Sequence, residues 1–357
     1  MTNAEFVLTV GIGLTVLLGW AFKHLPQEQW QMMATLPRTK QHSGRWEGVN
    51  LTYYGVITAS AAAVAIVIFL MLMASVHVRL SRALTVVVGI IACCLPASRL
   101  VARVIERKPH TSTVAGAVFV GQLIAPLALL AVNGCMATDG VLSPLGPTMA
   151  AIAVAYVFGE GLGRLACISF GCCYGKPIAA VRPGVRRLFE RFHFAFEGDT
   201  KKIAYESGLQ GTKVVPIQAL TSTLYTAVGL VSMFLFLESS YGTAYALAML
   251  FSQGWRIYSE TLRADHRGGG KISVYQKMTV VGMAYAAALS LVFPAAAVRA
   301  NLAAGLAALW DPLVIITLQI LWAVIFAATG WSMVTGSRLS FYVESDALSL
   351  LNGADVG

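Results

Sequence analysis

Residues 50–76 read NLTYYGVITASAAAVAIVIFLMLMASV, and this apolar run decides the fold class. A helix needs roughly 18 or more apolar residues to cross the hydrocarbon core of a bilayer, and this run is long enough. Similar runs recur along the chain, and about nine of them are candidate spans. They are Glu5–Phe22, Asn50–Val76, Ala83–Ala102, Val114–Val132, Thr148–Phe170, Pro216–Leu237, Tyr241–Ile257, Met278–Val298 and Leu309–Val334. We therefore predict an all-α fold, a polytopic transmembrane bundle of about seven to nine spans.

The composition also indicates that much of the chain lies in a membrane. Of the 357 residues, 57% are hydrophobic and only 12% are charged, whereas soluble domains carry roughly a quarter charged residues. The formal net charge of +9 fits contact with anionic lipid headgroups. Nucleic acid is not expected as a partner, because the basic residues lie in short loops without a basic stripe or interleaved aromatic residues.

Two polar stretches interrupt the apolar runs. The first polar stretch, Lys23–Val49, follows the first apolar run and carries Pro26, Pro37 and several glutamines. We predict an interfacial loop there. Residues Cys172–Val215 form the longest hydrophilic insertion and carry many Lys and Arg residues. Because a structureless connection of this length is uncommon, we predict a headgroup-level subdomain or a mobile lid.

The segment Gly159–Pro177 reads GEGLGRLACISFGCCYGKP and places two charges in or near an apolar run. Such charges are costly in a membrane unless they are paired or solvated. Glu160 and Arg164 are four residues apart and could neutralise one another on one helix face. Alternatively, Arg164 offers a planar fork of donors to a phosphate or carboxylate, which is the interpretation we favour. Gly175 either permits a close backbone turn near an anion or belongs to an ordinary helix end.

A second charged segment, Trp255–Arg267, reads WRIYSETLRADHR. On a continuing helix, Arg256, Glu260 and Arg263 would all lie on one face. This face is either a salt-bridged helix end at the membrane surface or a binding site for an anion. Tyr54, at the start of the second apolar run, is either an aromatic interface anchor or a hydrogen-bond donor to a lipid phosphate.

The six cysteines mostly lie in or beside apolar runs, which argues against a disulfide framework. Cys172 and Cys173 are adjacent and lack the spacing of zinc ligands. Cys167 precedes Cys172 by five residues, so a regular helix would not bring the two together. We therefore expect no metal site and no cofactor, and we interpret these cysteines as small apolar side chains. A thiol-redox membrane protein that uses Cys172 and Cys173 is an alternative hypothesis.

Four motifs, in order, resemble those of the prolipoprotein diacylglyceryl transferase family. Residues 163–177, GRLACISFGCCYGKP, resemble the family signature, commonly written GRxGNFxNGExxG. Tyr53-Tyr54-Gly55 resembles a Trp-Tyr-Gly motif, and residues 215–218 (VPIQ) resemble His-Pro-x-Gln. Residues 256–263 (RIYSETLR) resemble R-F-x-x-E-x-x-R, and the resemblance extends over roughly residues 50–298.

The sequence departs from the family at several functional positions. The Asn and Glu of the signature are Cys167 and Cys172 here, and a Tyr-Glu pair corresponds to Leu220 and Thr221. The family histidine falls on Val120. The residue expected as a base or essential donor is therefore missing.

The resemblance implies an enzyme that moves the diacylglyceryl group of phosphatidylglycerol to the lipobox cysteine thiol of a prolipoprotein and releases glycerol phosphate. Its catalytic residues would be Tyr54, Arg164, Arg256 and Glu260, and its substrate-binding residues Cys167, Cys172, Gly175, Gln218 and Arg263. The arginines would hold the lipid phosphate and stabilise the departing charge. The alternative is a catalytically divergent membrane protein that binds or transports a lipid or anion with the same cations.

The resemblance also implies a multi-pass protein of the bacterial cytoplasmic (inner) membrane, with phosphatidylglycerol and a lipoprotein precursor or another acceptor as partners. It divides the chain into a core, residues 49–298, that contains the polar insertion 172–215. Residues 1–48 would add an N-terminal span with the interfacial loop, and residues 299–357 a C-terminal span with a tail. The positive-inside rule would place the insertion in the cytoplasm, whereas the family resemblance places it outside.

Overall fold

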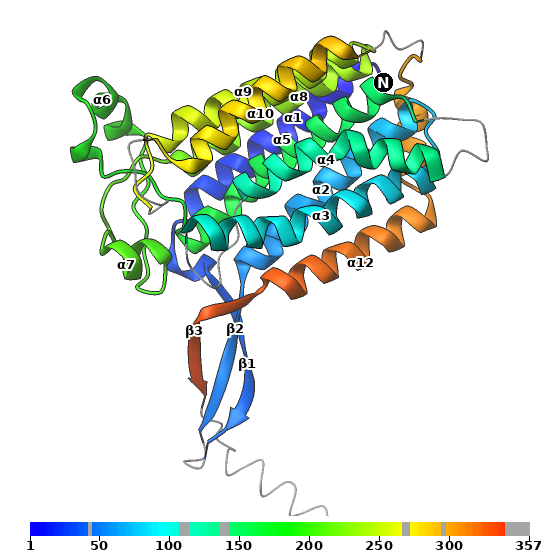
Figure 1. Ribbon diagram of the computed structural model, residues 1–357. Helices are drawn as coiled ribbons and strands as arrows, with labels where there is room; N and C mark the ends of the chain where they lie inside the picture. Colours follow the sequence, from blue (N-terminus) through cyan, green and yellow to red (C-terminus); the bar gives the residue numbers. More distant parts are fainter. Residues whose placement is uncertain (42–44, 107–113, 136–142, 266–271, 294–297, 340–357) are drawn as a thin grey trace, which may run out of the picture.

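A computed structural model describes residues 1–41, 45–106, 114–135, 143–265, 272–293 and 298–339, and its long helices form one bundle (Figure 1). The long helices are α1 Asn3–His24, α2 Tyr53–Ser75, α3 Leu80–Glu106, α4 Val114–Cys135, α5 Leu145–Phe170, α8 Ile217–Leu237, α9 Tyr241–Glu260, α10 Val274–Val292 and α12 Pro312–Thr329. A short helix, α11 Leu302–Ala308, precedes α12. Within the described residues, seven of these helices are long and apolar enough to cross a membrane. The predicted helical bundle is confirmed.

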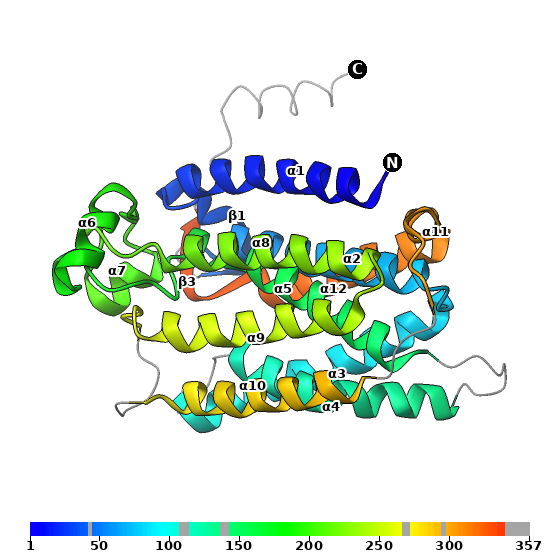
Figure 2. The ribbon, with the colours of Figure 1, turned by 90° about the horizontal axis from the view of Figure 1, so that it is seen from above.

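Helices α9 and α10 lie side by side in the bundle (Figure 2) but are less apolar and are not among these seven. Polar side chains explain the difference in α9, which contains Gln253, Arg256 and Glu260. Helix α10 begins with a polar capping box. The Ser273 hydroxyl accepts the Gln276 N–H, and the Gln276 side chain accepts the Ser273 N–H.

Helix α5 lies at the centre of the bundle, where it packs against α2, α8 and α9. In its membrane-length stretch 67% of the residues are buried, compared with 11% for α1 and 6% for α12. The charged residues of α5 are therefore shielded from both lipid and water, which makes their partners decisive for the site.

The predicted loop at Lys23–Val49 is wrong, because this segment contributes to a three-stranded antiparallel sheet. The strands are β1 Met32–Lys40, β2 Trp46–Thr52 and β3 Trp331–Leu339, in the order β1-β2-β3. The sheet projects away from the helices at one end of the bundle and points downward in Figure 1. It therefore joins the segment before α2 to the segment after α12.

Position in the sheet explains how a proline-containing, polar segment can be a strand. Pro37 lies in β1, an edge strand, where a missing N–H is tolerated because one side of the strand needs no partner. Asn50 in β2 is buried, and its Oδ1 accepts hydrogen bonds from Thr35 and Ser337, each at 2.7 Å. One side chain of the central strand thus ties both outer strands.

The polar insertion is a folded subdomain at the same end of the bundle (Figure 1). It contains two helices, α6 Pro183–Arg191 and α7 Lys202–Ser207. Its apolar side chains are buried together with residues of α1 and α5; they are Phe194, Phe196, Ile203 and Val214. Of the two predicted alternatives, the structure shows the subdomain.

Lys201 connects this subdomain to the bundle through hydrogen bonds. It is fully buried, and its Nζ donates hydrogen bonds to the carbonyl oxygens of Ser169 and Leu25 at 2.7 and 3.2 Å. Burial lowers the pKa of Lys201 to about 7. Its neutral form therefore becomes accessible near neutral pH.

Candidate functional site

Two arginines share the carboxylate of Glu160 in the middle of the bundle. Arg164, one turn later in α5, donates to one Glu160 oxygen, and Arg256 of α9 donates to the other. Arg256 Nη2 also donates to the Tyr156 hydroxyl at 3.2 Å. The side chains of Glu160, Arg164 and Arg256 are only 3%, 12% and 10% exposed. The three charges leave the cluster with one net positive charge.

The structure contains the Glu160–Arg164 pair, the alternative that the sequence analysis did not favour. This pairing does not use the full donor capacity of the cluster. The Nε atoms of Arg164 and Arg256 are buried and have no hydrogen-bond acceptor among the described residues. A buried donor left without an acceptor costs about 1–3 kcal/mol. A ligand with several anionic oxygens, such as a phosphate, matches this unused capacity.

The predicted common helix face for Arg256, Glu260 and Arg263 is wrong. Helix α9 ends at Glu260, because the next N–H groups bond carbonyls three residues back and tighten the chain into a turn. Arg263 lies beyond that turn, where its guanidinium makes two hydrogen bonds, of 2.8 and 2.7 Å, to Asp265. The guanidinium of Arg263 is therefore already paired with the Asp265 carboxylate.

A sharply turned segment follows α5. Gly171 ends the helix at φ +70°, and Cys173 has φ +57°, an uncommon value for a residue with a side chain. Gly175 pairs with the backbone of Arg263, and a Cβ at Gly175 would lie 2.3 Å from the Val215 carbonyl oxygen. No residue other than glycine fits at position 175 without moving this backbone.

Gln218 supports the same turn from the start of α8. It is buried, and its Nε2 donates to the Cys172 carbonyl oxygen at 2.9 Å. Its Oε1 has no hydrogen-bond donor among the described residues. Gln218 therefore positions the cysteine segment and still has an acceptor to offer.

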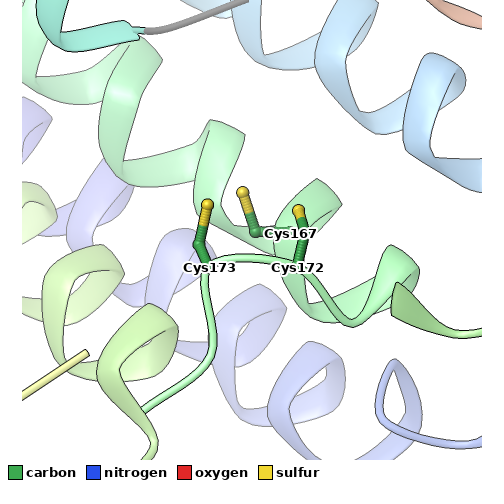
Figure 3. Close-up of side chains that lie close together, drawn as sticks. All are labelled: Cys167, Cys172 and Cys173. Atoms are coloured by element: carbon green, nitrogen blue, oxygen red, sulfur yellow. The ribbon is translucent and has the colours of Figure 1, made fainter. Parts of the chain in front are cut away.

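The expectation that Cys167 lies apart from Cys172 is wrong. The Sγ atoms of Cys167, Cys172 and Cys173 all lie within 4.8 Å of one another, and Figure 3 shows them on the same side of the turn. Helical spacing does not apply across this segment, because the chain leaves the helix at Gly171. The three cysteines are a thiol cluster, and they are not separate apolar fillers.

Tyr54 lies beside this cluster in the first turn of α2. Its ring packs edge-on against Phe170, with the ring centroids 5.7 Å apart. Its hydroxyl is within electrostatic range of Arg164 and of all three thiols. The structure thus brings Tyr54, Arg164 and the thiol cluster into one region.

Val120 lies in α4 and is partly buried. This helix packs mainly against α3 and α10, with slight contact to α5. Of the other departures from the family, Thr221 accepts a hydrogen bond from Trp255 at 2.9 Å. A valine cannot take up a proton, so position 120 supplies no base.

Sequence reasoning missed two residues of the site. Tyr156 contacts Arg256, and its place four residues before Glu160, on the same helix face, is the signal that points to it. Asp265 engages Arg263 and lies only two residues after it in a segment of high charge.

The apolar helices and the buried polar cluster define an integral membrane protein with a cationic site in its core. A family model described as prolipoprotein diacylglyceryl transferase matches residues 45–298, and the chain belongs to this family. The resemblance read from the four motifs is thereby confirmed, and the family implies a transferase of lipoprotein biosynthesis. The chain matches no curated protein.

Proposed function

We propose that the protein transfers the diacylglyceryl group of phosphatidylglycerol to an acceptor thiol, the lipobox cysteine of a prolipoprotein, and releases glycerol phosphate. The observation that carries the proposal is the pair of buried arginines held on Glu160 with unused N–H donors. Membership in the family supports the reaction class. We also place the protein in the bacterial inner membrane and treat residues 1–48 and 299–357 as additions to its catalytic core.

In this reaction the acceptor thiol releases its proton to water, and its sulfur attacks the glycerol carbon that carries the phosphate ester. A C–S bond forms, the C–O bond breaks, and its electron pair leaves on a phosphate oxygen. The charge therefore grows on the phosphate, where Arg164 and Arg256 donate. These donors stabilise the transition state more than the ground state, which is what accelerates the step.

Glu160 positions the guanidinium groups of both Arg164 and Arg256. Glu260 ends α9 and interacts electrostatically with Arg263, so we assign it the orientation of that second arginine. We assign Tyr54 a hydrogen bond to the lipid phosphate, because its hydroxyl lies within electrostatic range of Arg164. Gly175 and Gln218 shape the turn that lines the acceptor side of the site.

The proposal is tested with purified protein in liposomes of labelled phosphatidylglycerol and a peptide that carries a lipobox cysteine. Mass spectrometry should find a diacylglyceryl thioether on the peptide and an equal amount of glycerol phosphate. Arg164→Lys and Arg256→Lys should each lower the amount of product by about 10–100-fold, whereas Arg186→Lys, on the exposed helix α6, should retain it.

A second candidate is a non-catalytic protein that binds or transports an anionic lipid, and Val120 in place of the family histidine favours it. Saturable binding of phosphatidylglycerol without transfer to thiol, hydroxyl or amine acceptors would select this candidate. The two functions share the arginine site and differ only in the proton and group transfer.

A further inference from the structure

The three-thiol cluster has the geometry of a metal site with one open position. Zn²⁺ binds thiolates at about 2.3 Å in tetrahedral geometry, which puts the sulfurs roughly 3.8 Å apart. The Sγ atoms of Cys167, Cys172 and Cys173 lie within 4.8 Å of one another and on one side of the turn (Figure 3). Small side-chain rotations therefore bring all three sulfurs to bonding distance of one ion.

The backbone around the cluster is held by contacts that involve no metal. Gly171 turns the chain out of α5, the positive φ of Cys173 redirects its side chain, and Gln218 bonds the Cys172 carbonyl oxygen. A site whose ligands are already fixed loses less conformational entropy when it binds.

Exposure differs among the three ligands. Cys167 is 9% exposed, whereas Cys172 and Cys173 are intermediate. The cluster is therefore closed on the side of α5 and approachable on the side of the turn. A fourth ligand would have to come from that approachable side.

The surrounding charges suit a thiolate-rich complex. Three thiolates and one divalent cation carry one net negative charge. Arg164, Arg263 and Lys202 are all within electrostatic range of the cluster. Such a shell stabilises an anionic complex, and the all-sulfur donor set excludes hard cations such as Mg²⁺ and Ca²⁺, which require oxygen ligands.

From this geometry we propose that Cys167, Cys172 and Cys173 bind a thiophilic divalent cation of the Zn²⁺ type, whose fourth position takes the acceptor thiol. The role of the acceptor rests on the function proposed above. On binding the metal, the acceptor thiol releases its proton to water and becomes a metal-bound thiolate. Its sulfur then forms the C–S bond while the electrons of the C–O bond leave with glycerol phosphate.

The metal site would promote deprotonation of the acceptor thiol, which Val120 cannot do. A metal-bound thiolate needs no histidine to remove its proton, because the cation lowers the pKa of a coordinating thiol. Arg164 connects the two halves of the site, because it bonds Glu160 and also lies within electrostatic range of Cys167 and Cys173. The nucleophile and the leaving phosphate would then meet at Arg164.

Metal binding is tested with reduced, metal-free protein in detergent, titrated with Co²⁺. One equivalent should produce thiolate-to-cobalt charge-transfer absorption, and Zn²⁺ should remove it. Cys167→Ser, Cys172→Ser and Cys173→Ser should each weaken Co²⁺ binding by more than about 100-fold, since losing even an outer partner costs about 10–100-fold. Cys93→Ser, on the exposed surface of α3, should bind as the wild type does. Absence of the absorption band, or its persistence in Cys173→Ser, would overturn the metal site.

The role in transfer is tested separately, in the liposome assay with metal-free and Zn²⁺-loaded wild-type protein. Transfer should fall at least about tenfold on metal removal and return with Zn²⁺. Equal transfer in both states would refute the inference and leave the proposed function standing. Stoichiometric Zn²⁺ binding with no transfer in either state would refute the proposed function and leave the metal site standing. A disulfide between two of these cysteines in protein freshly isolated from cells would favour the thiol-redox alternative and contradict the metal site.

Discussion

Replacing Glu160 by glutamine removes the one negative charge that two buried arginines share. Arg164 and Arg256 would then face each other as like charges, with side chains 12% and 10% exposed and little water to screen them. The glutamine keeps the volume of the side chain and one carbonyl oxygen, so the loss is mainly electrostatic.

The expected cost follows from the burial of the pair. Breaking a buried ion pair by removing one partner destabilises a protein by about 3–5 kcal/mol, because a buried charge is left uncompensated. Glu190→Gln is the matched control, since Glu190 also pairs with an arginine four residues away, at 3.0 Å from Arg186. The side chains of Arg186 and Glu190 are both 54% exposed, and such surface pairs contribute about 0–1 kcal/mol to stability.

The assay is thermal and denaturant unfolding of both variants in one detergent, followed by tryptophan fluorescence. Glu160→Gln should unfold at clearly lower temperature and denaturant concentration than Glu190→Gln, which should match the wild type. Equal stability of the two variants would show that the arginines do not depend on Glu160, and the site as described would be wrong.

Three further predictions concern the guanidinium of Arg256, the turn at Gly175 and the buried Lys201. Arg256→Lys should leave the protein folded but lower transfer by about 10–100-fold, since a charge-assisted hydrogen bond contributes about 1.5–3 kcal/mol, whereas Arg186→Lys should have no effect in the same assay. Gly175→Ala should lower the melting temperature, because its Cβ would lie 2.3 Å from a carbonyl oxygen, whereas Gly184→Ala, with open space around it, should not. Lys201 has a folded-state pKa of about 7 and an unfolded value of about 10.4, so the unfolded state binds more protons between these values and stability should rise with pH there. In Lys201→Met the melting temperature should change less between pH 7 and about pH 10 than in the wild type, and an unchanged slope would contradict the assignment.

Local patterns predicted the parts of the molecule that local chemistry determines. The apolar runs predicted the helices, and the four-residue spacing indicated the Glu160–Arg164 pair as one of two alternatives. The family signature likewise lies within one short segment, where sequence alone is informative.

Long-range partners could not be predicted in this way. Arg256 reaches Glu160 across 96 residues of sequence, and Asn50 contacts Thr335 across 285, so neither pairing has a local signal. The thiol cluster was missed for a different reason. It depends on the backbone turn between Gly171 and Cys173, whose positive φ values no helical periodicity reveals.

Diacylglyceryl transfer by this protein is tested most directly by mass spectrometry of a lipobox substrate made in cells depleted of their own transferase and supplied with this protein. The wild type should produce a diacylglyceryl thioether on the substrate cysteine, and Arg256→Lys at equal expression should produce about 10–100-fold less. An unmodified cysteine beside well-expressed wild-type protein that still binds phosphatidylglycerol would show that the protein binds the lipid without transferring its diacylglyceryl group.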